Sequence, residues 1–421
     1  MTGKVFVIGG GLAGLSAATI LASRGAPVTL LEAAGQAGGR CRSYFDAAVG
    51  GVIDNGNHLV LSGNRAVHDY LARIGARDAL QGPAHAQFDF VDLRDGKRWR
   101  LKPGEGPLPL WVTRDAQRVP GTAMGEYLRY LPLLWAGPKT RIGDVVKERG
   151  ALWERLMRPF LLAVLNTEPE DSSAALAGAV LRETLAKGGR HYRPRIAHPT
   201  LAAAFVEPAL RYLERRKADV RLGTRLRGMT MTHRHVMALE TGEAIQPIDR
   251  HDAVVLAVPP WVAGELVPDL TVPNDFRAIV NAHFRYRPPA GSPAMLGVIG
   301  GTAEWIFTFP DRISVTVSGA DAIVDKDREE LARLIWADVA KALGMNDAMP
   351  DSIPPWQIVK EKRATFAATP AQDARRPEAK TPWRNLFLAG DWTRTGLPAT
   401  IEGALRSGEK AAALAARHLS L

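Results

Sequence analysis

The first 32 residues alternate between short apolar runs and glycines. Residues 4–8 are mostly apolar, glycines occupy positions 9–11, residues 12–22 are apolar over the length of a helix, and residues 28–32 form a second short run. An apolar run of four to eight residues that ends at glycine is typical of a buried strand. This segment therefore predicts a strand, a helix and a second strand parallel to the first.

The rest of the pattern divides the chain into further segments. Residues 64–203 have mainly helical periodicity, and a mixed strand and helix pattern covers 266–355. Between these segments lie the strand patterns at 219–222, 226–232, 236–239 and 251–258. A strand at 386–389 and a helix at 400–418 come last. The strand and helix pieces of a nucleotide-binding sheet are thus divided among the beginning, middle and end of the chain.

Composition excludes two classes of protein. With 421 residues, 46% of them hydrophobic, the chain can bury a large core, which excludes intrinsic disorder. Its single cysteine, Cys41, excludes an intramolecular disulfide framework and favours a cytoplasmic location. The formal net charge of +10 contains no block of like charges and no nucleic-acid motif accompanies it. We therefore expect no nucleic-acid partner and retain an attraction to anionic lipid as the alternative to a merely solvated surface.

The glycine-rich segment carries the chemistry of a dinucleotide site. In Gly9-x-Gly11-x-x-Gly14, the first glycine permits a tight turn and the second lets the backbone approach a pyrophosphate. The third lets the helix and the strand pack closely, and the N-terminus of that helix presents amide donors to phosphate. Glu32 ends the second strand, where a carboxylate accepts hydrogen bonds from ribose hydroxyls.

Two distant segments indicate a flavin in place of a nicotinamide cofactor. Gly38-Gly39-Arg40 follows the ribose acid, and the planar fork of Arg40 suits a phosphate. Near the other end, a strand runs into Gly390-Asp391, and Pro398 precedes a helix. The positive end of that helix would stabilise the negative charge of a reduced flavin. A simple nicotinamide-dependent dehydrogenase has no need of this second, C-terminal binding segment.

This layout resembles the flavin amine oxidase and phytoene desaturase superfamily, in which these segments and a mid-chain hairpin wrap an extended FAD. The resemblance places the backbone of Leu226 at the adenine. It implies a noncovalent FAD, because no cysteine stands near the C-terminal ring segment, and we expect no metal site. The FAD-binding residues that it implies are Gly9, Gly11, Leu12, Ala13, Gly14, Glu32, Ala33, Gly39, Arg40, Gly56, Asn57, His58, Leu226, Gly390, Asp391, Thr400 and Ile401.

The same resemblance implies the fold class and the domain organisation. We expect an α/β fold with a discontinuous Rossmann-type FAD-binding domain, amine oxidase-like, and an inserted α+β substrate-binding domain. The three parts of the FAD-binding domain are expected at 1–63, 204–265 and 356–421. A mainly helical insertion that faces substrate or membrane is expected at 64–203, and the α+β substrate domain at 266–355.

Several segments are similar, more narrowly, to the hydroxysqualene dehydroxylases, also called squalene-associated FAD-dependent desaturases. These segments lie at 54–59, 159–167, 360–366, 389–393 and 396–404. The resemblance implies reduction of hydroxysqualene by reduced FAD to squalene and water, in squalene and hopanoid biosynthesis. It also implies a squalene-type lipid substrate, with squalene-pathway enzymes and an electron donor as candidate partners.

Removal of an allylic hydroxyl needs an acid near the oxygen and a dry, apolar site. His58 is the candidate acid because an imidazole can hold a proton near pH 7, and the alternative is that it only fixes its loop. Asp54 is a candidate to orient this loop or to share the proton, and the alternative is that it bonds turn amides. Asn166 and Thr167 are candidates for contact with the substrate hydroxyl, or else for polar groups packed on an apolar helix.

One apolar segment is a candidate for contact with a membrane. Residues 127–135 include Trp135 and run into Lys139 and Arg141. An apolar, tryptophan-bearing edge beside basic residues suits peripheral docking on the inner face of the cytoplasmic membrane. The alternative is that these residues belong to the core of the substrate domain.

Three other functions remain open from the sequence. A polyene desaturase or isomerase would share the FAD site, and a desaturase would run in the oxidative direction. An amine oxidase is less favoured because Trp392 and its neighbours do not form a persuasive aromatic pair. A flavoprotein that scaffolds other enzymes at a membrane would bind FAD and lipid without turnover.

Overall fold

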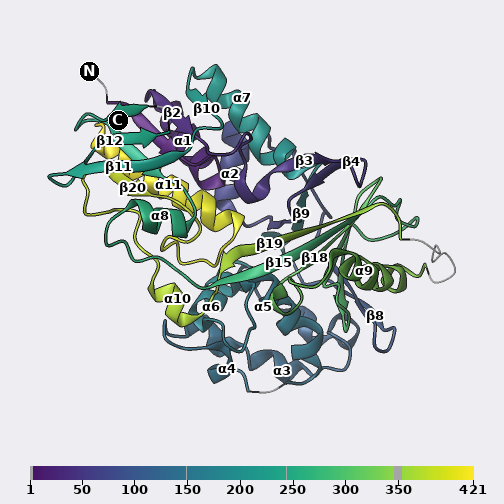
Figure 1. Ribbon diagram of the computed structural model, residues 1–421. Helices are drawn as coiled ribbons and strands as arrows, with labels where there is room; N and C mark the ends of the chain where they lie inside the picture. The colour runs from purple at the N-terminus through teal and green to yellow at the C-terminus, as the bar shows by residue number, and fades with distance from the viewer. Residues whose placement is uncertain (1–2, 148, 243, 346–352) are drawn as a thin grey trace.

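The computed structural model describes residues 3–147, 149–242, 244–345 and 353–421. Its first lobe, at the top of Figure 1, is built on a parallel sheet of five strands in the order β10-β2-β1-β14-β20. These strands are β1 (Val5–Ile8), β2 (Val28–Leu31), β10 (Asp219–Arg221), β14 (Ala253–Leu256) and β20 (Leu386–Leu388). Three regions that are distant in sequence therefore form one sheet, as the divided pattern of strands predicts.

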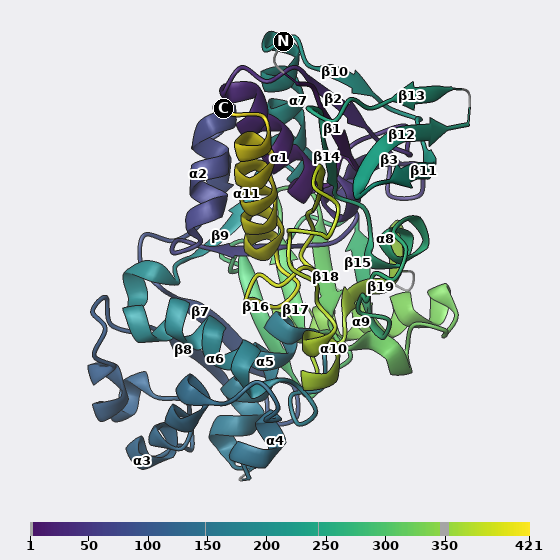
Figure 2. The same ribbon diagram turned by 90° about the vertical axis from the view of Figure 1, so that its left-hand side faces the viewer.

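Helices cover this sheet and bury its aliphatic side chains. They are α1 (Leu12–Ser23), α2 (Arg65–Ile74), α7 (Glu207–Arg215) and α11 (Ile401–His418). Figure 2 shows α1, α2 and α11 side by side. Gly408 permits this close packing, since a Cβ built there would lie 2.3 Å from the carbonyl oxygen of Ala13. The C-terminal helix is thus pressed against the first helix of the chain.

Smaller sheets surround the parallel one. The antiparallel sheet β11-β12-β13 consists of β11 (Leu226–Thr232), β12 (His235–Thr241) and β13 (Ile245–Pro247). His233 and Arg234, both with positive φ, form the tight turn between its first two strands. The remaining short strands are β3 (Ser43–Asp46), β4 (Gly51–Asp54), β5 (Leu59–Leu61), β6 (Leu80–Gln81) and β9 (Pro194–Ala197). Together they connect the first lobe to the second.

The second lobe contains a sheet of seven strands in the order β19-β15-β18-β17-β16-β7-β8. The strands are β7 (Phe88–Asp92), β8 (Arg98–Leu101), β15 (Phe276–Phe284), β16 (Met295–Ile299), β17 (Trp305–Thr308), β18 (Ile313–Val317) and β19 (Trp356–Phe366). Helix α9 (Arg328–Leu343) packs on one face, where its Leu331 and Ile335 join Val280 and Val315 in a buried cluster.

Short helices form the lower part of the molecule in both views (Figures 1 and 2). They are α3 (Met124–Leu128), α4 (Ile142–Val145), α5 (Arg158–Leu165) and α6 (Ala174–Glu183). Two further short helices, α8 (Pro260–Leu266) and α10 (Pro370–Ala374), lie in later segments. Within the described ranges, each helix is either too short or too polar to cross a bilayer.

The segment 64–203, expected to be mainly helical, also contains strands. Strand β7 pairs in parallel with β16, and β8 pairs with β7 at the edge of the large sheet. Strand β7 joins this sheet through a partner about 200 residues later in the chain, so local periodicity did not reveal its place in the fold. The boundaries of the five predicted segments stay a prediction.

Candidate active site

Two of the three glycines of the first motif have the backbone roles that their spacing predicts, and the third borders open space. Gly9 has a φ of +108°, and a Cβ there would lie 2.4 Å from the carbonyl oxygen of Ala257. A Cβ on Gly14 would lie 1.9 Å from the carbonyl oxygen of Gly9, so helix and strand touch at that point. A Cβ on Gly11 would meet no atom within 4 Å. Gly11 therefore borders open space at the N-terminus of α1, as a pyrophosphate cradle requires.

Glu32 connects this cradle to the next loop. Its carboxylate accepts hydrogen bonds from the backbone amides of Gly10, at 2.6 Å, and Ala34, at 2.8 Å. The carbonyl oxygen of Glu32 accepts a bond from Thr224, in the turn that leads into β11 and Leu226. The structure thus brings together the predicted ribose acid, the adjoining Ala33 and the predicted adenine contact.

Arg40 connects three segments that the sequence keeps far apart. Its guanidinium forms an ion pair with Asp391 at 2.7 Å and donates to the carbonyl oxygen of Ala364 in β19. Gly39, which precedes it, packs against Gly11. In the structure, the guanidinium of Arg40 therefore pairs with a carboxylate, whereas the sequence suggested a phosphate as its partner. Phosphate contact by Arg40 stays a prediction.

The C-terminal segment from Gly390 into α11 borders the region around Arg40, because Asp391 pairs with Arg40. Gly390 has a φ of +146°, and its amide donates to Ser407 in α11 at 2.8 Å. Thr400 caps α11 by accepting a bond from the amide of Gly403 at 3.0 Å, which places Ile401 in the first turn. The carboxylate of Asp391 and the N-terminus of α11 are thereby fixed relative to one another.

These residues fit an extended FAD. The open space at Gly11 and the uncapped first turn of α1, with Leu12 and Ala13, would hold the pyrophosphate. Glu32 has acceptor capacity left for a ribose, because each of its oxygens accepts one amide bond. The N-terminus of α11 supplies a positive dipole end for the flavin ring.

The loop that follows β4 carries the candidate catalytic residues. Asp54 is buried, accepts a bond from the hydroxyl of Ser43 at 2.5 Å and another from the amide of Leu201 at 2.9 Å. Burial raises the pKa of Asp54 above its usual value. These bonds tie the end of β4 to the chain near residue 201, and a role of Asp54 in orienting the loop or sharing the proton stays a prediction.

His58 ends this loop close to Arg40. Removal from solvent and the charge of Arg40 lower the pKa of His58 to about 4, and a hydrogen bond with the Arg40 backbone opposes this effect. With this pKa the imidazole is neutral at pH 7. The sequence suggested a histidine that holds its proton near neutrality, whereas this environment favours the alternative that His58 fixes its loop.

Asn166 and Thr167 lie together at the C-terminal end of α5 and are almost fully buried. Asn166 donates to the hydroxyl of Thr365 at 2.9 Å and accepts from the amide of Gly319 at 2.7 Å. The hydroxyl of Thr167 accepts a bond from the amide of Ala368 at 2.9 Å. Both side chains thus connect elements, in agreement with the packing alternative, and contact with substrate stays a prediction.

Three residues of this region were missed by the sequence reasoning. Asn281 in β15 and Thr316 in β18 bond to the loop that contains Gly56 and Asn57. Arg376, just after α10, is almost fully buried and donates to the carbonyl oxygens of Asp391 and Thr393. One signal was available, because Asn281 is a polar residue in the otherwise apolar run 278–282. No local sequence pattern marked Thr316 or Arg376 as a residue of this site.

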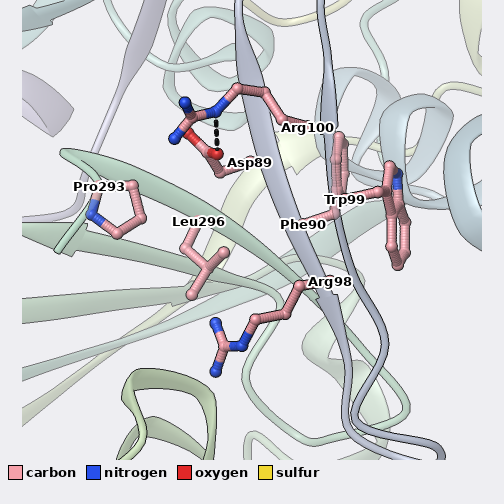
Figure 3. A pocket seen from close by; sticks show the side chains of 7 residues that line it. All are labelled: Asp89, Phe90, Arg98, Trp99, Arg100, Pro293 and Leu296. Atoms are coloured by element: carbon pink, nitrogen blue, oxygen red, sulfur yellow. Dashed lines mark hydrogen bonds and ion pairs between the residues drawn. The ribbon is translucent and has the colours of Figure 1, made fainter. Parts of the chain in front are cut away.

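A cavity of about 350 Å³ lies at the outer edge of the seven-stranded sheet (Figure 3). Arg100 and Asp89 form an ion pair at 2.6 Å beside it, and Leu296 and Pro293 face them. Its lining shares no residue with the predicted FAD site. We therefore assign this cavity no part in cofactor binding.

Comparison with known proteins agrees with this site. Residues 12–416 match the family of flavin containing amine oxidoreductases. The chain is 54% identical over 415 residues to hydroxysqualene dehydroxylase of Rhodopseudomonas palustris, with 98% of each chain covered. It is 51% identical to the hydroxysqualene dehydroxylase of Sinorhizobium fredii, with 99% of each chain covered.

A solved structure has the same fold at low sequence identity. Cyclohexylamine oxidase of Brevibacterium oxydans superposes with a TM-score of 0.74 at 18% identity, and the match covers 100% of both chains. This likeness confirms the predicted fold class, a Rossmann-type FAD domain with an inserted substrate domain. By its match to the family model and its identity to the curated relatives, the chain belongs to the flavin containing amine oxidoreductases and, within them, to the hydroxysqualene dehydroxylases.

Proposed function

We propose that the protein is an FAD-dependent oxidoreductase that converts hydroxysqualene to squalene and water. The observation that carries this assignment is an identity of about one half over nearly the whole chain to relatives with that activity in their names. The glycine cradle, Glu32 and the N-terminus of α11 provide the matching FAD site. When bound in its reduced form, FAD supplies the hydride that takes the place of the hydroxyl group.

The residues of the chain have three tasks in this reaction. The Arg40–Asp391 pair and Thr400 orient the segments that surround the ring site. Aromatic side chains on the sheet face opposite α9, such as Phe90, Trp99 and Trp305, pack against one another in an apolar cluster that excludes water from the interior of the second lobe. Loss of the hydroxyl also needs a proton, and His58, in the loop predicted to line the ring, is the candidate donor.

An anaerobic single-turnover experiment tests the assignment. Protein with photoreduced FAD is mixed with hydroxysqualene in detergent, flavin absorbance near 450 nm is followed, and the lipids are extracted. Reoxidation with one squalene formed per flavin is the expected result. A flavin that stays reduced, with substrate shown to bind, contradicts the dehydroxylase assignment. Oxidised FAD that becomes reduced on addition of a polyene supports a desaturase.

His58→Ala separates the two roles of this residue. If His58 delivers the proton, we expect the variant to keep its FAD and to lose dehydroxylation by about 100-fold or more, within the range for a general acid. The wild-type rate should then rise as pH falls from 7 toward the pKa of about 4, because the protonated fraction increases. Near-normal turnover, with a flat profile over this range, assigns His58 to fixing the loop.

We also propose that the protein contacts the inner face of the cytoplasmic membrane peripherally. In the described part of the chain, six large apolar side chains between residues 108 and 135 are exposed. They form what we term the apolar face: Leu108 at 69%, Leu110 at 66%, Met124 at 48%, Leu128 at 61%, Leu131 at 45% and Trp135 at 77% exposed. Leu133 in the predicted segment is instead buried. Exposed apolar side chains at this density are typical of an interaction surface.

The charge and position of the apolar face favour an anionic bilayer. Residues 102–147 contain seven Lys and Arg against four Asp and Glu, and Lys102, Lys139 and Lys147 are exposed. Cationic side chains near an anionic leaflet each contribute about 1 kcal/mol of attraction. Helices α3 and α4 lie at the end of the molecule opposite the N- and C-termini (Figures 1 and 2). A lipid substrate that enters here would avoid transfer through water.

Vesicle flotation tests this contact. We expect the double variant Leu128→Ser, Trp135→Ser to bind vesicles of phosphatidylcholine and phosphatidylglycerol (7:3) at least about tenfold more weakly than wild type, because it removes apolar area that would enter the interface. The matched control is Phe45→Ser, Ile245→Ser, whose side chains are 68% and 71% exposed elsewhere. Equal binding of both variants and wild type contradicts the proposal.

A further inference from the structure

A row of polar side chains crosses the large sheet on the face opposite α9. Asn281 in β15 and Thr316 in β18 are direct neighbours in the register. Residues that alternate with them, such as Val280, Val315 and Val317, belong to the cluster packed under α9. Because side chains alternate between the faces of a strand, Asn281 and Thr316 point to the other face. That face meets the loop that follows β4.

The hydrogen bonds along this row have a defined direction. The hydroxyl of Thr316 donates its single proton to Asn281 Oδ1 at 2.8 Å. It must therefore accept in its contact with Asn57 Nδ2 at 3.1 Å. Asn281 Oδ1 also accepts from the backbone amide of Asn57 at 3.4 Å. The carboxamide of Asn57 is thus held by its nitrogen, which turns its oxygen away from Thr316.

Gly56 allows this arrangement because a side chain there would collide with Asn281. A Cβ built on Gly56 would lie 2.8 Å from Asn281 Nδ2, and that nitrogen donates to the carbonyl oxygen of Asn55 at 3.4 Å. Asn281 therefore contacts the loop on both sides of Gly56. These contacts join parts of the chain more than 220 residues apart and place the loop on the sheet of the second lobe.

The carboxamide oxygen of Asn57 has no hydrogen-bond partner among the described residues and is available to bind a ligand. Among the hydrogen bonds of the described residues, none uses Asn57 Oδ1. The side chain is half-buried, and its loop leads directly to His58 beside Arg40. A fixed carboxamide oxygen at this position can accept a hydrogen bond from an N–H or O–H group.

We propose that Thr316 and Asn281 are positioning residues that hold Asn57 so that its Oδ1 accepts a hydrogen bond from a donor in the active site. This inference rests on the proposed function, in which the donor is either an N–H of the reduced flavin ring or the O–H of the substrate. The preset orientation lowers the cost of ordering Asn57 when that donor binds. Thr316 therefore acts on the reaction only through Asn57.

The variants Thr316→Val and Thr316→Ser test this role. Valine keeps the shape of threonine and removes the hydroxyl, whereas serine keeps the hydroxyl. We expect Thr316→Val to lower kcat/KM for dehydroxylation about threefold to tenfold, the usual effect of one hydrogen bond, and Thr316→Ser to retain it. The matched control is Thr308→Val in β17, which removes a hydroxyl bonded to the carbonyl oxygen of Pro293. We expect that control to stay within twofold of wild type.

A double-mutant cycle with Asn57→Ala separates positioning from general support of the fold. If Thr316 acts through Asn57, Thr316→Val should have no further effect in the Asn57→Ala background. Equal losses in both backgrounds, or a loss that Thr316→Ser does not rescue, overturn the proposal.

The flavin itself gives a readout that does not depend on turnover. A shift of the flavin midpoint potential in Thr316→Val without substrate identifies the ring N–H as the donor. A rise in KM without such a shift identifies the substrate O–H. An inactive wild type that still shows the potential shift would contradict the proposed function and leave the role of Thr316 supported. If neither the potential nor the kinetics change, the positioning role is wrong.

Discussion

Replacing Gly11 with valine is expected to weaken FAD binding by about 100-fold or more and to leave the melting temperature of the apoprotein within about 2 °C. The backbone at Gly11 has φ −72° and ψ 175°, a conformation open to any residue, and no protein atom lies within 4 Å of the added Cβ. A side chain in that space would instead meet the pyrophosphate. Calorimetric titration of the apoprotein with FAD measures the affinity, and thermal unfolding measures the stability.

The comparison variant is Gly14→Ala in the same motif. Its Cβ would lie 1.9 Å from the carbonyl oxygen of Gly9, so this variant should destabilise the apoprotein before any ligand is added. The two variants thus distinguish an effect on FAD affinity, expected for Gly11→Val, from an effect on the stability of the fold, expected for Gly14→Ala. A Gly11→Val protein that binds FAD like wild type would show that the pyrophosphate lies elsewhere.

Replacing Arg376 with methionine should lower the free energy of unfolding by about 3–5 kcal/mol. Its guanidinium is buried, pairs with Asp373 at 2.8 Å and bonds to the carbonyl oxygens of Asp391 and Thr393 and to the hydroxyl of Thr395. Methionine would leave the carbonyl oxygens of Asp391 and Thr393, which belong to buried residues, without this donor. Urea unfolding of the apoprotein measures the loss.

Arg375→Met is the matched control for this variant. Arg375 is half-buried and makes one bond to the carbonyl oxygen of Val272 at 2.9 Å, so its replacement should cost about 1 kcal/mol. We expect Arg376→Met to lose FAD as well, because Arg376 holds the turn that presents Asp391 to Arg40. Similar stabilities of the two variants would show that the buried guanidinium is not required.

Local patterns were sufficient for the parts of the FAD site that are local in the chain. The roles of Gly9, Gly11 and Gly14 follow from one turn between a strand and a helix. The structure has the tight turn at Gly9 and the close packing at Gly14, and the pyrophosphate contact of Gly11 stays a prediction. The C-terminal helix was also predictable, because its apolar face repeats with helical period and Thr400 precedes it as a cap. In such segments, the residues that determine the local structure lie within a few positions of the turn or helix that they form.

The contacts that shape the reactive end of the site are long-range. Thr316 and Asn281 come from the inserted sheet and bond to residues 55–57. The polar Asn281 in an apolar run marks that residue, but no local pattern identifies the loop at 55–57 as its partner. The partner of Arg40 could not be read from the sequence for the same reason, since Asp391 lies 351 residues later. The neutral state of His58 depends on burial and on the charge of Arg40, and both arise only on folding.

The parallel sheet of the first lobe has a consequence for how the protein is made. Its central strand β1 is synthesised first, but its neighbour β14 needs β20 on its other edge, and α1 needs α11 against it. A nascent chain on the ribosome therefore exposes this apolar surface until residues 386–418 have emerged. The cofactor can be captured in its complete site only after that point, so a cell that translates faster than it supplies FAD accumulates apoprotein.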